Sequence, residues 1–271
     1  MRLKRYSILA LLMVFSALAF AQTKDLTLDE ILDRHFKAQG GVEKMKAVKT
    51  MRMTGRMTFG PGMEFPGVLV QSRPNRQRMD FTVQGMNITQ AYDGKTAWQV
   101  MPFQGNKDPE PMGEADAKDM IDDADFDGPL LDYKQKGNQV ELVGKADVEG
   151  SPTYKLKVTL KGGTVRFVYL DTDSFLEVHS EGKRMVRGSE VEFESNTGDY
   201  KEVGGLMFPH SIESGPKGAA QKQKLTIEKI ELNPKIEDAS FVMPEKKKDD
   251  AKPGDAKPAE KKPETKPPSQ I

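Results

Sequence analysis

Apolar and polar side chains alternate along much of the chain. From residue 50 to residue 59 nearly every second position is Met or Phe, and the positions between them are Arg or Thr. A period of two places successive side chains on opposite faces of a β-strand, so this segment predicts a strand with one apolar and one wet face. The same alternation recurs at 79–83, 86–92, 154–160 and 190–194. Counting such segments gives about ten or eleven strands.

Short turns between these segments predict antiparallel pairing, because parallel strands need a crossover of a dozen or more residues. Asp93-Gly94 and Gly162-Gly163 stand where hairpin turns are expected. Near the C-terminal end Ile230 is out of phase with the alternation before it, which predicts a β-bulge at Glu228 or Lys229. A sheet with this many strands favours a barrel or a strongly curled sheet over a flat, open one.

Helical patterns are few. Thr27-Leu28-Asp29-Glu30 has the form of a capping box and begins an amphipathic helix expected over Asp25 to Gln39. Two further helices are expected, at Glu43 to Lys49 and at Glu114 to Asp123. The expected fold is therefore mostly β (α+β), with two or three lid helices. This cover is smaller than the apolar face that it must hide, so we expect a partly filled apolar cavity.

Methionine is concentrated at the apolar positions of the expected strands. Methionines at strand spacing often only fill the hydrophobic core. A dense set of Met and Phe side chains can also form an adaptable lining for ligand chains of irregular or variable shape. The interior is expected to be lined by Met51, Met53, Met57, Phe59, Met79, Phe81, Met86, Ile88 and Trp98.

Composition narrows the class of protein. The chain has 41 basic and 41 acidic residues and no cysteine, so nothing indicates a nucleic-acid partner, a disulfide scaffold or a thiolate site. Residues 1–21 combine a basic start, an apolar run and an Ala-Phe-Ala ending, as in a cleaved secretory signal peptide, and we expect a periplasmic protein. One domain is expected over 22–244, followed by a disordered Lys/Pro-rich tail over 245–271.

Motifs for catalysis or metal binding are weak. Asp123 to Gly128 matches the first half of a calcium-binding EF-hand loop, but Lys134 stands where the loop needs a bidentate Glu. The histidines, His35, His179 and His210, have no ligand spacing, and His35 and His179 are expected to face water. Nucleophile and phosphate-binding motifs are missing. We therefore expect no catalytic residue, metal or cofactor.

Four turn and strand segments together resemble the periplasmic lipoprotein carrier LolA and the superfamily that includes LolB and the sensor RseB. They are 92–98 (YDGKTAW), 125–130 (DFDGPL), 204–209 (GGLMFP) and 241–244 (FVMP). The resemblance covers most of residues 26–244 and implies a half-open antiparallel barrel whose helices close an apolar cavity for acyl chains. The acidic insertion at 108–127 and the Lys/Pro tail depart from that pattern.

The leading hypothesis is a non-enzymatic periplasmic carrier or sensor for the acyl chains of lipoproteins or lipids. Its expected partners are an acylated lipoprotein or lipid and inner- or outer-membrane transport components, and it is expected to be a monomer. The alternative is a protein-interaction or signalling module of the same fold with a closed core. A periplasmic hydrolase is a third class, and it would need His, Asp and Ser or Tyr to converge inside the barrel.

Overall fold

The computed structural model describes residues 25–104, 106–186 and 189–245. The expected signal peptide and nearly all of the expected tail lie outside the described residues. The helices are α1 (Leu28–Ala38), α2 (Val42–Ala47), α3 (Glu114–Asp123) and α4 (Tyr133–Lys136), with 3-10 turns η1 (Pro102–Gln104) and η2 (Asp238–Ser240). The strands are β1 (Thr50–Thr58), β2 (Glu64–Ser72), β3 (Arg76–Val83), β4 (Met86–Tyr92), β5 (Ala97–Met101), β6 (Asn106–Pro111), β7 (Gln139–Val148), β8 (Ser151–Thr159), β9 (Val165–Asp171), β10 (Glu177–Val186), β11 (Ser189–Gly198), β12 (Lys201–Val203), β13 (Leu206–Phe208), β14 (Ser211–Pro216) and β15 (Gln223–Leu232).

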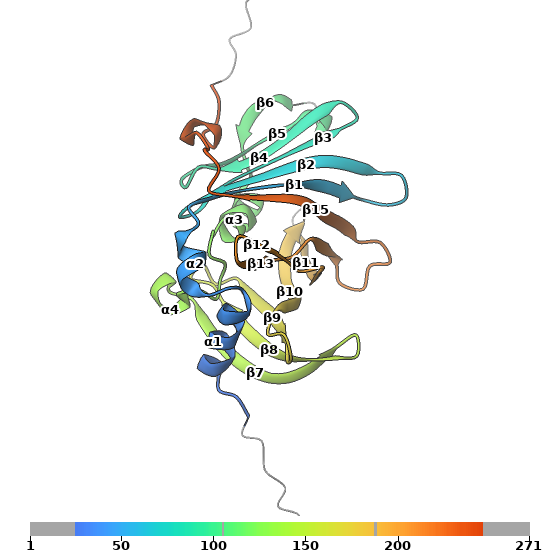
Figure 1. Cartoon of the computed structure of the whole chain (residues 1–271). Helices are drawn as coiled ribbons and strands as arrows, with labels where there is room; N and C mark the ends of the chain where they lie inside the picture. The colour runs from blue at the N-terminus through green and yellow to red at the C-terminus, as the bar shows by residue number, and fades with distance from the viewer. Residues whose placement is uncertain (1–24, 105, 187–188, 246–271) are drawn as a thin grey trace, which may run out of the picture.

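Thirteen of the described strands form one antiparallel sheet in the order β6-β5-β4-β3-β2-β1-β15-β14-β11-β10-β9-β8-β7. The end strands β6 and β7 do not pair, so the sheet curls without closing (Figure 1). The expected half-open, mostly β fold is confirmed. The strands outnumber the expected ten or eleven because short strands such as β12 and β13 are too brief to show an alternation.

Two local predictions are confirmed in detail. Thr27 caps α1, and the capping box with Glu30 is complete. Lys229 pairs with Thr54 whereas Ile227 pairs with Gly55, so the extra residue of the bulge is Glu228. A side chain could not replace the hydrogen of Gly55, because a Cβ atom there would lie 2.1 Å from the carbonyl oxygen of Thr226.

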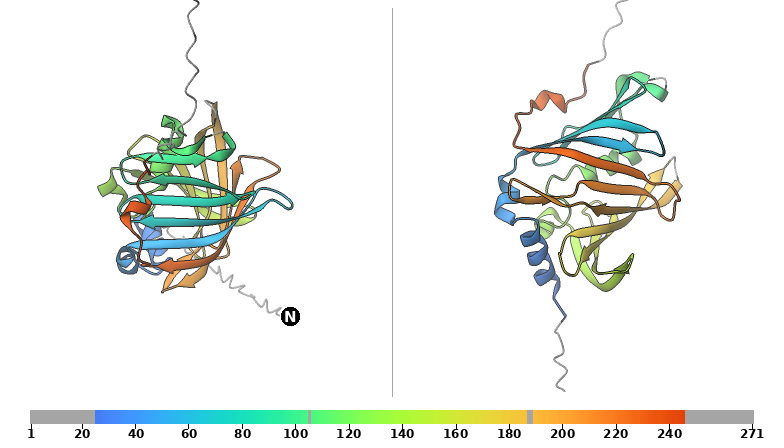
Figure 2. Two further views of the ribbon diagram at one scale, coloured as in Figure 1. Left: turned by 90° about the horizontal axis from the view of Figure 1, so that it is seen from above. Right: turned by 45° about the vertical axis from the view of Figure 1, so that its right-hand side comes forward.

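Helices and the β12–β13 hairpin cover the concave face of the curled sheet (Figures 1 and 2). On one half, Ile31 and Leu32 of α1 are buried against Leu156 and Leu170. On the other half, Met120 of α3 packs against β4 and β5. Between them, Met51, Ile227 and Ile230 form a third apolar cluster that packs against the hairpin. The core is therefore three separate clusters under an incomplete cover.

The chain after β15 packs on the opposite, convex face. Trp98 is 1% exposed, and its indole Nε1 donates a hydrogen bond to the carbonyl oxygen of Phe241 at 2.7 Å. Phe241 is fully buried, with the guanidinium of Arg76 over its ring. A guanidinium N–H of Arg78 donates to the carbonyl oxygen of Ser240 at 2.8 Å. Trp98 thus anchors the C-terminal segment, and this contradicts its expected place in the cavity lining.

Replacing Phe241→Ala should lower the free energy of unfolding by about 3–5 kcal/mol, because the variant leaves a cavity over Trp98. Val242→Ala is the matched control: that side chain is 50% exposed, so its loss should change stability by less than about 0.5 kcal/mol. Urea denaturation of both variants measures the difference. Equal effects of the two substitutions would contradict this anchoring.

Candidate functional site

A cavity of about 400 Å³ lies between the cluster around α1 and the cluster around Met51, under the cover of the concave face. Sites for small molecules commonly have about 300–1,000 Å³. Its lining consists of His35, Phe36, Gln39, Met45, Val48, Met51, Arg73, the loop 125–130, Glu177, Thr197, Tyr200, residues 206–209 and Ile212. Helices, hairpin and sheet all contribute to the wall.

The hairpin β12–β13 forms one wall of the cavity and is tied to the end of α1. Its Met207 N–H donates to the carbonyl oxygen of Gln39 at 3.0 Å. Leu206 is 4% exposed and Phe208 packs against the cluster around Met51. This hairpin contains the GGLMFP segment, so that sequence signature corresponds to a wall of the cavity.

Glu177 places a carboxyl group in this largely apolar wall. Its neighbour Tyr200 donates a hydroxyl hydrogen bond to the backbone carbonyl of Glu177 at 2.7 Å. Burial raises the pKa of Glu177 to about 7, against the smaller opposing effects of a hydrogen bond with Ser180 and the charge of Arg166. The protonated, uncharged form of Glu177 is therefore stable to a much higher pH than that of an ordinary carboxyl group.

His179 was expected to face water, and regular alternation would put Glu177, two residues before it, on the same face, but the two residues lie on opposite faces. Glu177 pairs with Leu170 and His179 pairs with Tyr169, so one extra residue between them shifts the register. The bulge turns Glu177 toward the cavity and leaves His179 on the convex face. His35 was also expected to face water, but it is 3% exposed, and its Nδ1 lies 2.7 Å from the carbonyl oxygen of Phe175.

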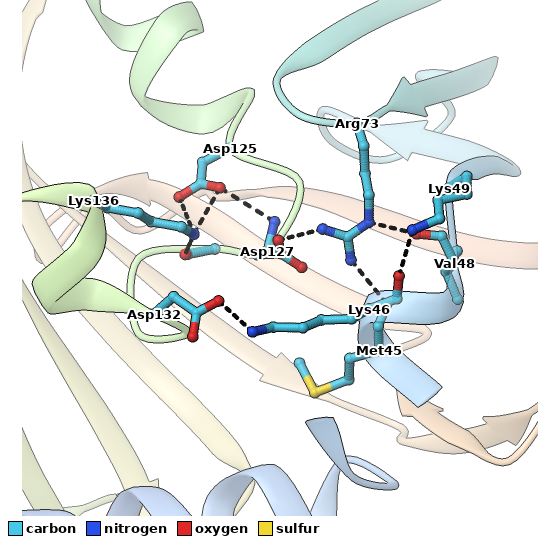
Figure 3. A network of polar contacts seen from close by, with 10 residues as sticks. Met45, Lys46, Val48, Lys49, Arg73, Asp125, Asp127, Asp132 and Lys136 are labelled. Atoms are coloured by element: carbon cyan, nitrogen blue, oxygen red, sulfur yellow. Dashed lines mark hydrogen bonds and ion pairs between the residues drawn. The ribbon is translucent and has the colours of Figure 1, made fainter. Parts of the chain in front are cut away.

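Arg73, in the turn between β2 and β3, joins three parts of the cover (Figure 3). It donates to the carbonyl oxygens of Val48, at 2.5 Å, and Met45, at 2.8 Å. It also forms an ion pair with Asp127, and its guanidinium lies over the ring of Phe126, 4.6 Å from the centroid. Arg73 therefore connects α2 to the loop that follows α3.

Two lysines extend this polar network (Figure 3). Lys46 of α2 forms an ion pair with Asp132 at 2.5 Å. Lys136 donates to both carboxylate oxygens of Asp125 and to the carbonyl oxygen of Gly128, at 2.7 to 2.8 Å. These oxygens belong to the segment that resembles half of an EF-hand loop, and a lysine ammonium group neutralises them. The segment thus closes the cavity as part of the cover.

Seven of the nine residues expected in the lining lie on the concave face. Directly opposed residues of antiparallel strands share a face. Met53 of β1 is opposite Leu69 of β2, and Leu69 is opposite Met79 of β3, so the three side chains share one face. Met51, Met53, Met57, Met79, Phe81, Met86 and Ile88 share this face. Of the nine, Met51 is in the wall of the cavity described above. Phe59 lies just past β1 and is 46% exposed, and Trp98 is on the convex face.

The cavity residues that sequence reasoning missed come from turns and from a bulge. By contrast, Phe36 lies in the helix expected over Asp25 to Gln39, and residues 206–209 lie in the GGLMFP segment. Arg73 and Tyr200 stand in turns, where alternation assigns no face. In the described part of the chain, every helix is too short or too polar to cross a bilayer.

Comparisons with solved structures agree with this architecture. A LolA superfamily protein from Nitrosomonas europaea superposes with a TM-score of 0.53 at 14% identity, covering 80% of this chain and 98% of that one. A DUF1329 family protein from Desulfovibrio piger superposes with a TM-score of 0.56 at 12% identity, covering 79% and 96%. No protein-family model and no curated protein matches the sequence significantly. The chain has a LolA-like fold, as the sequence resemblance implied.

The Glu177 carboxyl should make stability depend on pH. Its pKa is about 7 in the folded state and 4.5 in its ordinary state, so the folded protein binds more protons between these values and loses stability as pH rises through them. Glu177→Gln removes this dependence. The stability of wild type relative to Glu177→Gln should fall by up to about 3 kcal/mol from pH 4.5 to pH 8. Urea denaturation across this range measures it, and a constant difference would contradict the burial of this carboxyl.

Arg73→Ala should lower the free energy of unfolding by about 3 kcal/mol, because it leaves Asp127 without its partner and two carbonyl groups without donors. Backbone amides of α2 should also exchange with deuterium faster than in wild type. Arg56→Ala is the control, because Arg56 is 52% exposed and pairs with exposed Glu228, and its loss should cost less than about 1 kcal/mol. Unchanged exchange in α2 would show that Arg73 does not hold the cover.

Proposed function

We propose that this protein is a non-enzymatic carrier or sensor that binds acyl chains of lipoproteins or lipids in the cavity under its helical cover. The observation that carries the proposal is the cavity itself: about 400 Å³ remain between the sheet and the cover, with Phe36, Met45, Leu206 and Ile212 in the wall. The apolar part of this wall is suited to a hydrocarbon chain, and its polar residues, such as Arg73 and Glu177, could lie near a headgroup.

The energetics fit reversible binding. Each buried methylene group contributes roughly 0.8 kcal/mol, so an acyl chain of common length offers on the order of 10 kcal/mol before costs. Immobilising the chain and opening the cover subtract from this figure. Transfer then needs no chemistry, only a difference in affinity between the donor, the carrier and the acceptor.

The polar network around Arg73 is where the cover would open. It holds α2 against the loop 125–132 through ion pairs and hydrogen bonds, whereas the apolar clusters hold α1 and α3. Water can replace the ion pairs and hydrogen bonds that such a movement breaks, but it cannot compensate for apolar side chains that become exposed. A movement of α2 and this loop would therefore expose the cavity while the rest of the core stays packed.

The setting of this activity is proposed from the sequence. Residues 1–21 have the features of a secretory signal peptide, and a LolA-type fold is consistent with the periplasm. The partners would be an acylated lipoprotein or lipid and components of inner- or outer-membrane transport, with no nucleic acid and no cofactor. We propose that the mature domain acts as a monomer.

Native mass spectrometry of gently purified mature protein tests the proposal directly. We expect a fraction of the protein to carry co-purified lipid, and we expect the wild type to bind a fluorescent fatty acid. An apo mass together with no binding of the fatty acid would favour the alternative, an interaction module with a closed core.

Two tryptophan substitutions locate the ligand. Ile212→Trp should fill the cavity and weaken fatty-acid binding at least about tenfold, a loss of about 1.4 kcal/mol. Met79→Trp changes a residue of the same concave face outside the cavity wall, and it should weaken binding less than about threefold. Thermal denaturation confirms that both variants fold. The reverse order of effects would place the ligand along the Met-rich strands instead.

A further inference from the structure

The convex face of the sheet, away from the cavity, carries a compact group of metal-ligating side chains. His179 and Glu181 are two residues apart on β10 and therefore share a face. Glu194 on β11 lies directly opposite Glu181. One ligand atom from each of the three residues lies within 4.8 Å of the others. They border a recess of about 210 Å³.

The ring of His179 is fixed with one nitrogen available to the recess. Its Nδ1 lies 2.6 Å from Oδ1 of Asn196, and Nδ2 of Asn196 donates to Glu149 at 3.3 Å. An amide oxygen only accepts hydrogen bonds, so Nδ1 donates to Asn196 and carries a proton. With its proton on Nδ1, the imidazole can offer the lone pair of Nε2 to a metal ion. The residue is 8% exposed and packs edge-on against Tyr169. Nε2 is 3.8 Å from a Glu181 oxygen, beyond hydrogen-bond distance.

The two carboxylates are held in place by several donors, of which Tyr169 and Lys222 also line the recess. Tyr169 donates its hydroxyl to one oxygen of Glu181 at 2.7 Å, and Lys217 is 2.7 Å from the other oxygen. Lys155 lies 3.7 Å from Glu181. Glu194 accepts from the backbone N–H of Gly218 at 3.2 Å and pairs with Lys222 at 2.8 Å. Like charges directly opposite each other destabilise a sheet unless cations compensate them.

We propose that His179 Nε2, Glu181 and Glu194 form a binding site for a divalent transition-metal ion of the zinc type, with water completing its coordination. One imidazole and two carboxylates form a ligand set suited to zinc, and magnesium binds poorly to nitrogen ligands. Asn196 and Tyr169 occupy the positions of orienting groups behind two of the ligands, as is usual at metal sites. The strand spacing i, i+2 with a cross-strand partner brings the three ligands together.

Lys222 regulates this site by competition. Its ammonium group lies 2.8 Å from Oε1 of Glu194, the oxygen that also accepts from Gly218, so it repels a cation bound to that carboxylate. The side chain is 21% exposed and stands before β15, so it can turn into solvent. The acidic side chains of Asp147 and Glu149 also line the recess and favour a cation there. Removing the ammonium group should strengthen binding, which a purely structural ion-pair network would not predict.

Zinc titration calorimetry on metal-stripped, tag-free mature protein tests the proposal. We expect one equivalent of Zn²⁺ to bind to wild type and Mg²⁺ not to compete. His179→Gln should weaken binding at least about tenfold, a loss of about 1.4 kcal/mol, and Lys222→Met should strengthen it by about the same factor. His210→Gln is the matched control, because that buried histidine lies outside the cluster.

Two further measurements keep the test decisive. Cu²⁺ bound to the wild-type protein should show hyperfine coupling to one imidazole nitrogen in its electron paramagnetic resonance spectrum, and His179→Gln should lose it. If His179→Gln fails to fold, Glu194→Gln and Lys222→Met decide the matter by opposite changes in affinity. No saturable zinc binding by wild type, or equal binding by wild type and His179→Gln, would overturn the proposal. Neither result bears on fatty-acid binding, because the cavity lies on the other face.

Discussion

The structure depends on one constraint: a curled sheet of thirteen strands has more apolar concave surface than its helices can cover. α1 packs on one half of this surface, α3 packs on the other, and the hairpin β12–β13 and the loop after α3 share the space between them. Apolar surface left in water is unfavourable, so the cover is drawn onto the sheet. The remaining cavity lies between the cluster around α1 and the cluster around Met51, where no single element has a face large enough to fill it.

The two kinds of contact in the cover have different consequences. Ile31 and Leu32 hold α1 by close apolar packing, which tolerates little movement. α2 buries none of its own residues and is held through Arg73, Lys46 and the carbonyl groups at its C-terminal end. A cover with one part packed and another part tied by polar contacts can open locally while the fold persists. This division suits a protein that must both enclose and release an apolar ligand.

The two faces of the sheet carry different kinds of side chain. The concave face carries the three apolar clusters and the cavity, whereas the convex face carries ion pairs around Glu181 and the C-terminal segment anchored by Trp98. A single bulge between Glu177 and His179 decides which of these two neighbours belongs to which face. Because side chains alternate with a period of two, one extra residue exchanges the roles of the residues on either side of it.

The sequence alone determined the features that depend on neighbours along the chain. The capping box at Thr27, the bulge at Glu228 and the helix over 114–123 follow from local spacing, and the alternation of Met and Phe identified the concave face of β1, β3 and β4. Tertiary structure decided what depends on distant partners. Phe241 returns to bury Trp98 on the convex face, Arg73 reaches α2 and Asp127 from a turn, and Glu194 meets His179 across two strands. Periodicity reports which side of a strand a residue occupies, but only the folded chain brings together the residues that share a space.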